Sequence, residues 1–532
     1  MAPPKPQPTL RGAANVPRHF NGALTYAVVL IAVSQINFGL DQGIFSNTQA
    51  MPHFYRQFGA PDPKTGKYAL DPVFLSLLNS LPFICFFLGL VQGSYISNKW
   101  GRRTSMHVMC VWALISAAVC VSARGRVQVV AGRMINYLYI GMELAVVPII
   151  QSEMVPAPVR GFIVGTYQLG LGLGHILASL ICRATSDIDS NNSWIIPYGC
   201  MFLIPSIILC MLWHMPESPR WLLLQGRDDA ALASLRRLRV GRFTEEQIRD
   251  ELASFRSTIN VAADKGTWKE VFQGSNRKRT LIVCGVNVFF QLTGHNFVSK
   301  YGTIFLRSLN TFNAFSMSLI NSCINTLVII FTMFLSDMVG RVPLLITGAS
   351  IQTAALLTMG GLGTAGGERA PLPIREGITS MVTLFGVGFN LGWAPLSHVV
   401  AAEIPTLRLR DKIYGLGSAI NIIIQFLVAF IVPYLMDDAY AGLGPRVGFI
   451  FGTVAFVAVV FSWFCVPECS GRTLEEIDRL FLEGVPIRSF KTHVLADQEE
   501  DKGLQRNSES WPHKREDAKE LAGLMLEQSR AG

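Results

Sequence analysis

The sequence Asn98-Lys99-Trp100-Gly101-Arg102-Arg103 lies between two long apolar runs, residues 73–96 and 106–122. A helix that crosses a bilayer needs about 20 mostly apolar residues, and each run is close to this length. Lys and Arg side chains gathered in a short segment between two such runs are typical of a loop on the cytoplasmic side of a membrane. The segment therefore predicts two membrane-spanning helices joined by a short cytoplasmic loop.

Apolar runs of the same kind continue on both sides of this loop. Ten more occur, at residues 24–45, 129–150, 162–182, 195–215, 281–302, 314–336, 343–362, 378–402, 414–435 and 447–466. Hydrophobic residues make up 50% of the chain and charged residues only 16%, whereas soluble domains carry about 25% charged residues. Membrane-spanning β-strands would be about half as long and would alternate in polarity. We expect an all-α polytopic membrane protein with twelve transmembrane helices in two six-helix halves.

The polar segments divide the chain around these halves. Residues 1–22 predict a disordered N-terminal tail, 23–215 the N-terminal half, 216–280 a linker, 281–466 the C-terminal half and 467–532 a C-terminal tail. Within the linker, residues 230–238 and 244–255 have the pattern of short amphipathic helices. We interpret these helices as a solvated cap rather than an enzyme insert.

The basic residues of the short loops predict the orientation. They cluster at Lys99, Arg102 and Arg103, at Arg408, Arg410 and Lys412, and in the linker at Arg236, Arg237, Arg239, Arg277, Lys278 and Arg279. All these segments lie on one side if every span crosses once, and the positive-inside rule makes that side cytoplasmic. We expect a multi-pass protein of the plasma membrane with both termini in the cytoplasm. The sequon at Asn191 then lies outside, where glycosylation requires it.

Composition also excludes several classes of protein. The net charge of +9 is carried by loops and tails, and the sequence has no nucleic-acid-binding motif. The ten cysteines contain no C-x-x-C pair, so neither a zinc site nor a disulfide framework follows. Cys182 and Cys200 flank one external loop, where free thiols are favoured over a disulfide. We expect no metal, no cofactor, no nucleic-acid partner and no enzymatic activity.

An internal repeat relates the two halves. Arg102 and Arg103 after the second span correspond to Arg341 after the eighth span. Glu153 and Arg160 after the fourth span correspond to Glu403 and Arg410 after the tenth. These groups are interpreted as ion pairs that tie helix ends together, the alternative being charges that only fix the topology. Duplicated six-span halves are typical of secondary transporters, whose substrate site lies between the halves near the middle of the bilayer.

The chain resembles the sugar porter family of the major facilitator superfamily, and among its members the fungal hexose and disaccharide transporters. The resemblance extends over residues 24–480 and rests on short motifs that occur in family order. They are FGLDQG at 38–43, NKWGRR at 98–103, PIIQSE at 148–153, PESPRW at 216–221, QLTG at 291–294 and GRTLEEID at 471–478. The family implies a major facilitator fold and transport by alternating access.

Two opposite charges lie within the predicted spans. Asp41 is in the external half of the first span and Arg133 is near the external end of the fourth. An ionisable group inside a membrane is costly and usually functional, and protonation of Asp41 would release a paired Arg133. The resemblance implies that this pair couples transport to protons, the alternative being a static ion pair. Glu143 is a second acid in the fourth span, where it is either functional or a polar contact within the bundle.

A sugar site needs neutral amides for hydroxyl groups and an aromatic ring for the apolar face of the sugar. The spans contain amides at Gln168, Gln291, Asn296, Asn325 and Asn421, and aromatic rings at Phe389 and Trp393. The resemblance places Gln168, Asn325 and Asn421 at sugar-binding positions of the family. A single amide of this kind is otherwise a hydrogen bond between helices.

The chain also departs from the family pattern. Phe290 replaces a glutamine, Lys300 a tyrosine and His398 a tryptophan. We expect Lys300 to extend to the outer interface of the membrane, the alternative being that it indicates an acidic substrate.

The leading hypothesis is a proton-coupled transporter of a hexose or a related carbohydrate. A proton-coupled transporter or exporter of an acidic or aromatic metabolite is the alternative. A non-transporting sugar sensor is the third hypothesis, and the short segment after the last motif weighs against it. The expected partners are a sugar, a proton and the lipid bilayer, while the sequence leaves the oligomeric state open.

Overall fold

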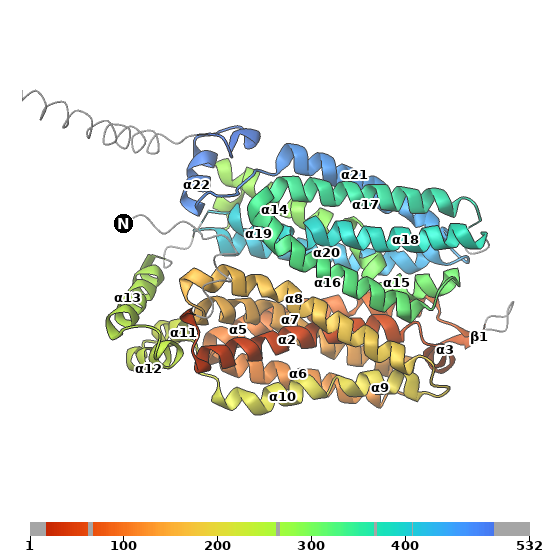
Figure 1. The fold of residues 1–532 in the computed structure, drawn as a ribbon, viewed down its shortest axis with the longest axis horizontal. Helices are drawn as coiled ribbons and strands as arrows, with labels where there is room; N and C mark the ends of the chain where they lie inside the picture. The colour runs from red at the N-terminus through yellow and green to blue at the C-terminus, as the bar shows by residue number, and fades with distance from the viewer. Residues whose placement is uncertain (1–17, 62–67, 262–265, 367–369, 407, 494–532) are drawn as a thin grey trace, which may run out of the picture.

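Two helical bundles lie side by side along their full length (Figure 1). The computed structural model describes residues 18–61, 68–261, 266–366, 370–406 and 408–493. Within these residues, twelve helical segments are long and apolar enough to cross a membrane, which confirms the predicted number of spans. Most of the predicted N-terminal tail and the end of the C-terminal tail, residues 1–17 and 494–532, lie outside the described residues.

The N-terminal half is built from the first six spans. Its helices are α2 (Gly22–Thr48), α4 (Pro72–Ser80), α5 (Pro82–Trp100), α6 (Arg102–Val121), α7 (Arg126–Met154), α8 (Ala157–Thr185), α9 (Asn192–Cys200) and α10 (Leu203–Met211), which η1 (Leu212–His214) extends. Four of the six predicted runs fall within these spans, and the runs 106–122 and 195–215 end one residue beyond them. The apolar run therefore marks the middle of a helix better than its ends.

The C-terminal half repeats this architecture. It contains α14 (Gly274–Leu292), α15 (His295–Leu309), α16 (Ala314–Val339), α17 (Arg341–Gly363), α18 (Leu372–Gly388), a π-helical turn η4 (Phe389–Trp393), α19 (Ala394–Glu403), α20 (Arg410–Met436), η5 (Gly444–Arg446) and α21 (Val447–Cys465). The two halves together form the all-α fold that the sequence predicts.

Some spans are interrupted where the sequence suggests a continuous run. The second span divides into α4 and α5 at Pro82, because a proline lacks the N–H that a continuous helix requires. The tenth span contains η4 just before Pro395. Such π-turns are frequent at functional sites.

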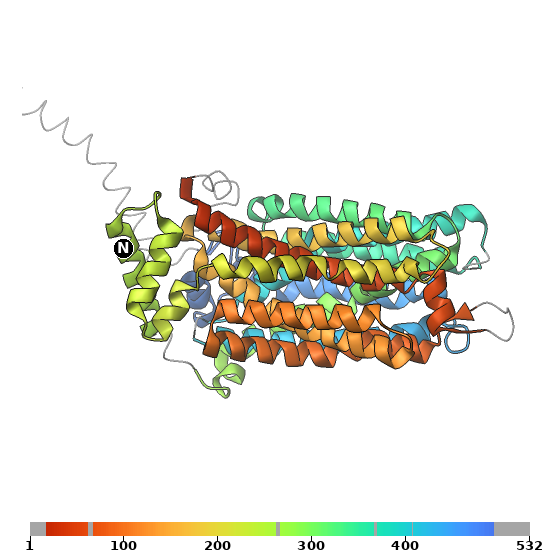
Figure 2. The ribbon, with the colours of Figure 1, turned by 90° about the horizontal axis from the view of Figure 1, so that it is seen from below.

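The two ends of the bundle differ. At one end, called the linker end, lie α11 (Pro219–Leu224), α12 (Asp228–Arg239) and α13 (Glu245–Val261), with η2 (Glu270–Phe272) following them in the chain (Figure 2). The opposite end, called the hairpin end, carries α3 (Pro52–Phe58) and a short antiparallel pair of strands, β1 (Ala60–Pro61) and β2 (Tyr68–Ala69). The structure confirms the two predicted linker helices as α12 and α13. The sequence analysis did not identify α11 or α3.

The predicted C-terminal tail is partly folded. It contains α22 (Leu474–Leu482) and η6 (Ile487–Ser489). Thr473 and Glu476 form a capping box that starts α22, an arrangement that satisfies otherwise free N–H groups at a helix start. Asp478 of α22 pairs with Arg279 of α14 at 2.6 Å. The chain is therefore folded beyond the last span as far as η6.

The two halves contact each other mainly through α8 against α16 and α4 against α20. The described hydrogen bonds between them involve residues toward the hairpin end. Thr303 donates to Asn47 Oδ1 at 2.9 Å, and Ser46 donates to the Ser299 carbonyl at 2.7 Å. Ser76 donates to the Phe430 carbonyl at 2.7 Å. The halves are therefore held together at the hairpin end.

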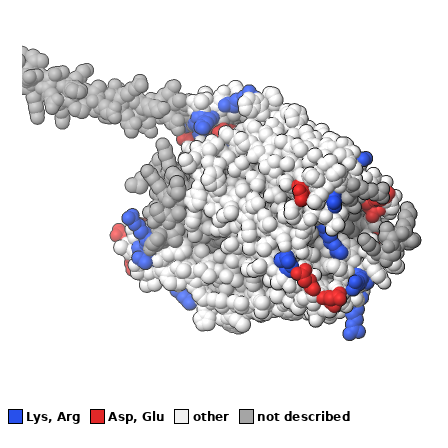
Figure 3. Space-filling model, turned by 45° about the vertical axis from the view of Figure 1, so that its right-hand side comes forward, with Lys and Arg blue, Asp and Glu red and all other residues white. Residues whose placement is uncertain are grey.

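The outer surface matches a bilayer. Figure 3 shows a broad face without charged side chains, with Lys, Arg, Asp and Glu gathered toward its ends. Large apolar side chains are exposed along the helices, among them Leu88, Phe331 and Phe456. Exposed apolar area on this scale fits contact with lipid rather than water.

Candidate functional site

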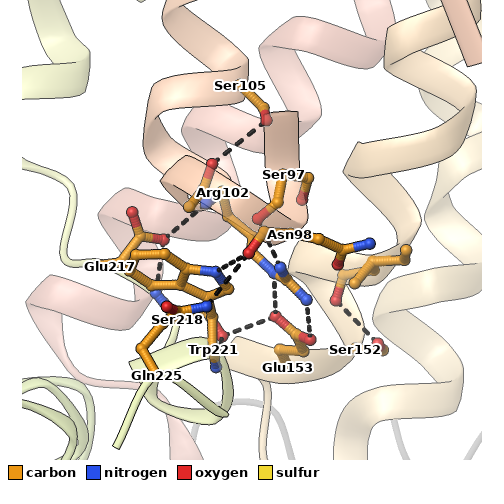
Figure 4. A network of polar contacts seen from close by, with 12 residues as sticks. Ser97, Asn98, Arg102, Ser105, Ser152, Glu153, Glu217, Ser218, Trp221 and Gln225 are labelled. Carbon is orange, nitrogen blue, oxygen red and sulfur yellow. Dashed lines mark hydrogen bonds and ion pairs between the residues drawn. The ribbon is translucent and has the colours of Figure 1, made fainter. Parts of the chain in front are cut away.

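A buried ion pair joins two helix ends at the linker end of the N-terminal half (Figure 4). Arg102 at the start of α6 contacts both carboxylate oxygens of Glu153 at the end of α7, at 2.9 and 2.8 Å. Ser218, which caps α11, donates to Glu153 at 2.6 Å. Both charged side chains are about as buried as core residues, at 5% and 6% exposure. The pair therefore ties α6, α7 and the linker together.

Glu217 completes this network through the backbone. Its carboxylate accepts hydrogen bonds from the amides of Arg102 at 3.0 Å and Arg103 at 3.3 Å. Gly101 has φ of +98°, and a Cβ there would lie 2.6 Å from the Glu217 carboxylate. A glycine is required because a side chain would be strained and would displace this carboxylate. Burial raises the pKa of Glu217, while the amide hydrogen bonds oppose that shift.

The C-terminal half reproduces the arrangement. Arg341 pairs with Glu403 at 3.1 Å, and Glu468 accepts from the amides of Arg341 and Val342 at 3.1 and 2.9 Å. Gly340 has φ of +105°, and its Cβ would lie 2.7 Å from Glu468. The two networks join corresponding residues of the two halves, although the Arg341–Glu403 pair is more exposed than Arg102–Glu153.

The two remaining arginines of the repeat are placed differently from these pairs. Arg160 donates weakly to the carbonyl of Val155 at 3.4 Å. Two guanidinium nitrogens of Arg410 are buried without a hydrogen-bond partner. The predicted ion pairs between helix ends are therefore Arg102–Glu153 and Arg341–Glu403, and neither Arg160 nor Arg410 takes part in them.

Asp41 and Arg133 are both buried but do not form an ion pair with each other among the described residues. Asp41 accepts a hydrogen bond from Asn136 at 3.2 Å. Arg133 donates to Asn79 at 3.1 Å and lies over the ring of Phe45, 4.4 Å from its centroid. In this conformation a neutral amide, rather than the predicted arginine, contacts the Asp41 carboxyl group.

Lys300 is buried, so the prediction that it extends to the membrane interface is wrong. Its side chain is enclosed at 5% exposure. It donates to the Tyr137 hydroxyl at 2.9 Å and also contacts Gln42. Tyr137 and Gln42 belong to the other half, so polar partners across the interface hold the ammonium group inside the protein. His175 and His295 also interact with it electrostatically.

Three amides form a chain between α14 and α20. Gln291 donates to Asn421 at 3.1 Å, and Asn421 donates to Asn287 at 3.2 Å. The Oε1 atom of Gln291 is buried without a partner. Asn296 donates to the carbonyl of Gln425 at 3.3 Å. The structure thus brings two predicted amides together and adds Asn287, which the sequence analysis did not single out.

Four rings from α14, α15 and the tenth span form a separate cluster. His295 stacks on Phe389 with ring centroids 4.2 Å apart, and Phe290 contacts Phe389 at 5.3 Å. His398 contacts Phe290 at 5.4 Å. Two of the residues that depart from the family pattern, Phe290 and His398, therefore lie side by side. Trp393 lies elsewhere, buried against Phe289 in the core of the C-terminal half.

The remaining predicted residues are half-buried or exposed. Gln168 on α8 and Asn325 on α16 are half-buried, and Asn325 lies against Gly386 of α18. Asn191 is exposed at the hairpin end and donates to Gln57 at 3.3 Å. Among the described residues, no group of three or more His, Cys, Asp and Glu side chains converges to hold a metal ion.

Comparison with known proteins agrees with this architecture. Residues 27–481 match the family described as sugar (and other) transporter. The high glucose sensor RGT2 of Saccharomyces cerevisiae is 30% identical over 466 residues, which cover 85% of this chain and 60% of the sensor. The chain thus spans less than two thirds of that relative. The probable glucose transporter rco-3 of Neurospora crassa is 29% identical over 465 residues, covering 85% of this chain and 78% of rco-3.

Solved structures show the same fold. The inward-open xylose transporter XylE from E. coli superposes with a TM-score of 0.70 at 22% identity, covering 86% of this chain and 99% of XylE. The proton:xylose symporter XylE bound to 6-bromo-6-deoxy-D-glucose superposes with a TM-score of 0.68, at the same identity and coverage. Because the family match extends over most of the chain, this multi-pass membrane protein belongs to the sugar (and other) transporter family.

Proposed function

We propose that the protein is a proton-coupled sugar transporter of the plasma membrane. The observations that carry the proposal are the amide chain of Gln291, Asn421 and Asn287 and the ring cluster that contains Phe290 and Phe389. An amide offers both a donor and an acceptor, which matches a sugar hydroxyl. An aromatic ring covers the apolar face of a sugar. Membership of the sugar transporter family and the relatives named for glucose support the same substrate class.

The proposed transport cycle uses the two halves as rigid bodies. The linker end, with its basic residues, would face the cytoplasm. The hydrogen bonds between the halves toward the hairpin end would then close the external side. Breaking these contacts and rocking one half against the other would expose the amide chain to the outside.

Asp41 would carry the coupled proton. It is fully buried and its nearest described partners are amides, Asn136 and Asn37. A buried carboxylate without a cation is costly, so binding a proton would stabilise this conformation. Releasing the proton would favour a state in which a cation approaches Asp41, and Arg133 on α7 is the candidate.

Uptake into vesicles tests the proposed function. Proteoliposomes that contain the protein are expected to accumulate labelled glucose when the outside is made acidic, and to reach only equilibrium without a pH gradient. A gradient of one pH unit stores about 1.4 kcal/mol, which corresponds to about tenfold accumulation for one proton per sugar. Protein-free vesicles are the control. Binding of glucose without any uptake would favour a sensor and contradict the proposal.

A second candidate substrate, an acidic metabolite, is favoured by one observation. Lys300 is buried between the halves near Arg133, so two basic side chains lie close together there. Such a cluster would suit a carboxylate and either direction of transport.

One pair of variants separates the two substrates. For a sugar, Gln291→Ala is expected to weaken glucose binding about five- to a hundredfold, since losing one buried hydrogen-bond partner costs about 1–3 kcal/mol. Lys300→Met is then expected to matter less for a neutral sugar. If the substrate is an acid, glucuronate is used in place of glucose, and Lys300→Met is expected to weaken its binding more than Gln291→Ala does. Isothermal titration of both variants with both compounds measures the order, and glucose binding unaffected by Gln291→Ala would contradict the sugar site.

A further inference from the structure

Glu143 lies in the interior of α7 and has no assigned role. Its side chain is completely buried. Ser34 of α2 donates to its Oε2 atom at 2.6 Å, while its Oε1 atom has no hydrogen-bond partner. None of the ion pairs among the described residues involves Glu143. An acid in the middle of a span is thus held by a single hydroxyl group.

This environment favours the protonated acid. Moving an ionised carboxylate from water into an apolar interior is very costly unless a cation or several hydrogen bonds compensate. One hydrogen bond from Ser34 does not provide that compensation, whereas the neutral carboxyl group has little charge to compensate. Ionisable residues inside spans are rare and usually lie on ion or proton pathways. The position therefore fits a proton-binding site.

Polar side chains connect Glu143 with Asp41. Asn37 of α2 donates to the Tyr139 hydroxyl at 2.8 Å and to Asp41 at 3.5 Å. Tyr139 lies one turn before Glu143 on α7, so the two side chains share a face of the helix. Ser34 lies one turn before Asn37 on the facing helix, and α2 and α7 are in contact. A polar seam thus runs between the two helices from Asp41 to Glu143.

The seam leads toward the linker end. Asp41 contacts Asn136, and Glu143 follows Asn136 by seven residues on α7. A rise of 1.5 Å per residue places Glu143 about 10 Å closer to the linker end. A gap too small for a water molecule lies beside this part of the seam, lined by Ser34, Asn37 and Tyr139 and by mostly apolar side chains of α6 and α10.

We propose that Glu143 is a second proton-binding carboxyl group of the transporter, on the cytoplasmic side of Asp41. The proposal rests on the proton coupling proposed above. In the transfer, Glu143 first releases its proton toward the linker end and becomes a carboxylate. The Asp41 carboxylic acid then loses one proton and becomes a carboxylate, while the Glu143 carboxylate gains that proton and is a carboxylic acid again, so charge and protons balance.

The groups around Glu143 determine its response to pH. Those that interact with it electrostatically are Asp41 on α2, Tyr139 on the same helix, Cys110 on α6 and Tyr167 on α8. None of the four is a cation. No cation among them compensates the charge that Glu143 gains when it loses its proton. Loss of this proton is therefore expected to require a change in conformation.

Infrared spectroscopy of the purified full-length protein tests the site directly. Protonated buried carboxyl groups give C=O bands that are separate from those of carboxylates and amides. We expect one such band to disappear in Glu143→Gln and another in Asp41→Asn at neutral pH. Ser34→Ala, which retains the acid but removes its hydrogen bond, is expected to shift the Glu143 band without removing it. Unchanged bands in Glu143→Gln would overturn the proposal, whatever the substrate.

Transport measurements test the function of the site. In proteoliposomes, Glu143→Gln is expected to retain glucose counterflow but to lose about tenfold accumulation under a gradient of one pH unit. Glu143→Asp is expected to restore part of it, and Glu246→Gln on the exposed face of the linker is the control. Normal accumulation by Glu143→Gln would overturn the role of Glu143. If Asp41→Asn alone accumulates glucose normally, the coupling role of Asp41 fails instead, and the infrared result still decides the site at Glu143.

If Glu143→Gln does not fold, Glu143→Asp serves as the second variant. Its shorter side chain is expected to move both the infrared band and the pH at which accumulation is half-maximal. An infrared band and a pH profile identical to those of the unmodified protein would contradict the proposal.

Discussion

Asp41→Asn is expected to abolish proton-driven accumulation of sugar while leaving exchange of sugar across the membrane. The carboxyl group is fully buried and accepts a hydrogen bond from Asn136. An asparagine has nearly the same shape but cannot bind or release a proton. The variant therefore cannot use the energy of the pH gradient. It loses the roughly tenfold accumulation of sugar that a gradient of one pH unit supports. Labelled glucose uptake and counterflow in the same proteoliposomes measure both properties.

A matched variant controls for an effect of the amide itself. Asp229→Asn makes the same chemical change on the exposed face of α12, and it is expected to accumulate glucose normally. Uphill accumulation by well-folded Asp41→Asn at the level of the unmodified protein would contradict the proposed proton site. Loss of counterflow as well would indicate a structural role instead.

Arg102→Ala is expected to destabilise the protein strongly. Arg102 and Glu153 are almost completely buried and share two hydrogen bonds. Removing the arginine leaves the Glu153 carboxylate buried without its cation, which typically costs about 3–5 kcal/mol. We expect a large loss of folded protein and a lower temperature of unfolding. Fluorescence-detected thermal unfolding in detergent measures this change.

Two further variants separate charge from position. Arg103→Ala removes the neighbouring arginine, whose guanidinium group lies 5.8 Å from the centroid of the Trp213 ring, and a contact of this kind contributes about 0.5–1 kcal/mol at exposed sites. Replacing both buried partners, in Arg102→Met with Glu153→Met, is expected to recover much of the loss because no buried charge remains unpaired. Equal stability of Arg102→Ala and Arg103→Ala would show that the buried pair contributes little.

The sequence predicted the linker-end networks better than the central site. Arg102, Glu153, Arg341 and Glu403 lie next to span ends, where the repeat spacing places them at matching helix ends. The central residues depend on which face of a helix turns inward. Lys300 shows the difference, because its position in the sequence suggested the membrane interface while Tyr137 and Gln42 from the other half enclose it.

The residues that the sequence analysis missed share one property. Gln42, Asn79, Asn287 and Tyr137 are polar groups inside apolar runs. Asn79 and Asn287 contact the predicted site residues Arg133 and Asn421, and Gln42 and Tyr137 contact Lys300. The available signal was the polarity itself, but a single amide in a span is compatible with any interhelical contact. Only the position of the facing helix in the tertiary structure shows which residue such a side chain contacts.

The sequence by itself determined the twelve spans, the division into two halves and the family. Apolar length decides whether a segment crosses a membrane, because every backbone polar group inside the bilayer must be satisfied within a helix. The tertiary structure alone decided that Asp41 contacts Asn136 rather than Arg133, that Lys300 is enclosed, and that Phe290 and His398 join one ring cluster. The rotation of each helix and the depth of its side chains are set by packing against neighbouring helices. That packing depends on residues far apart in the chain, so no single apolar run contains it.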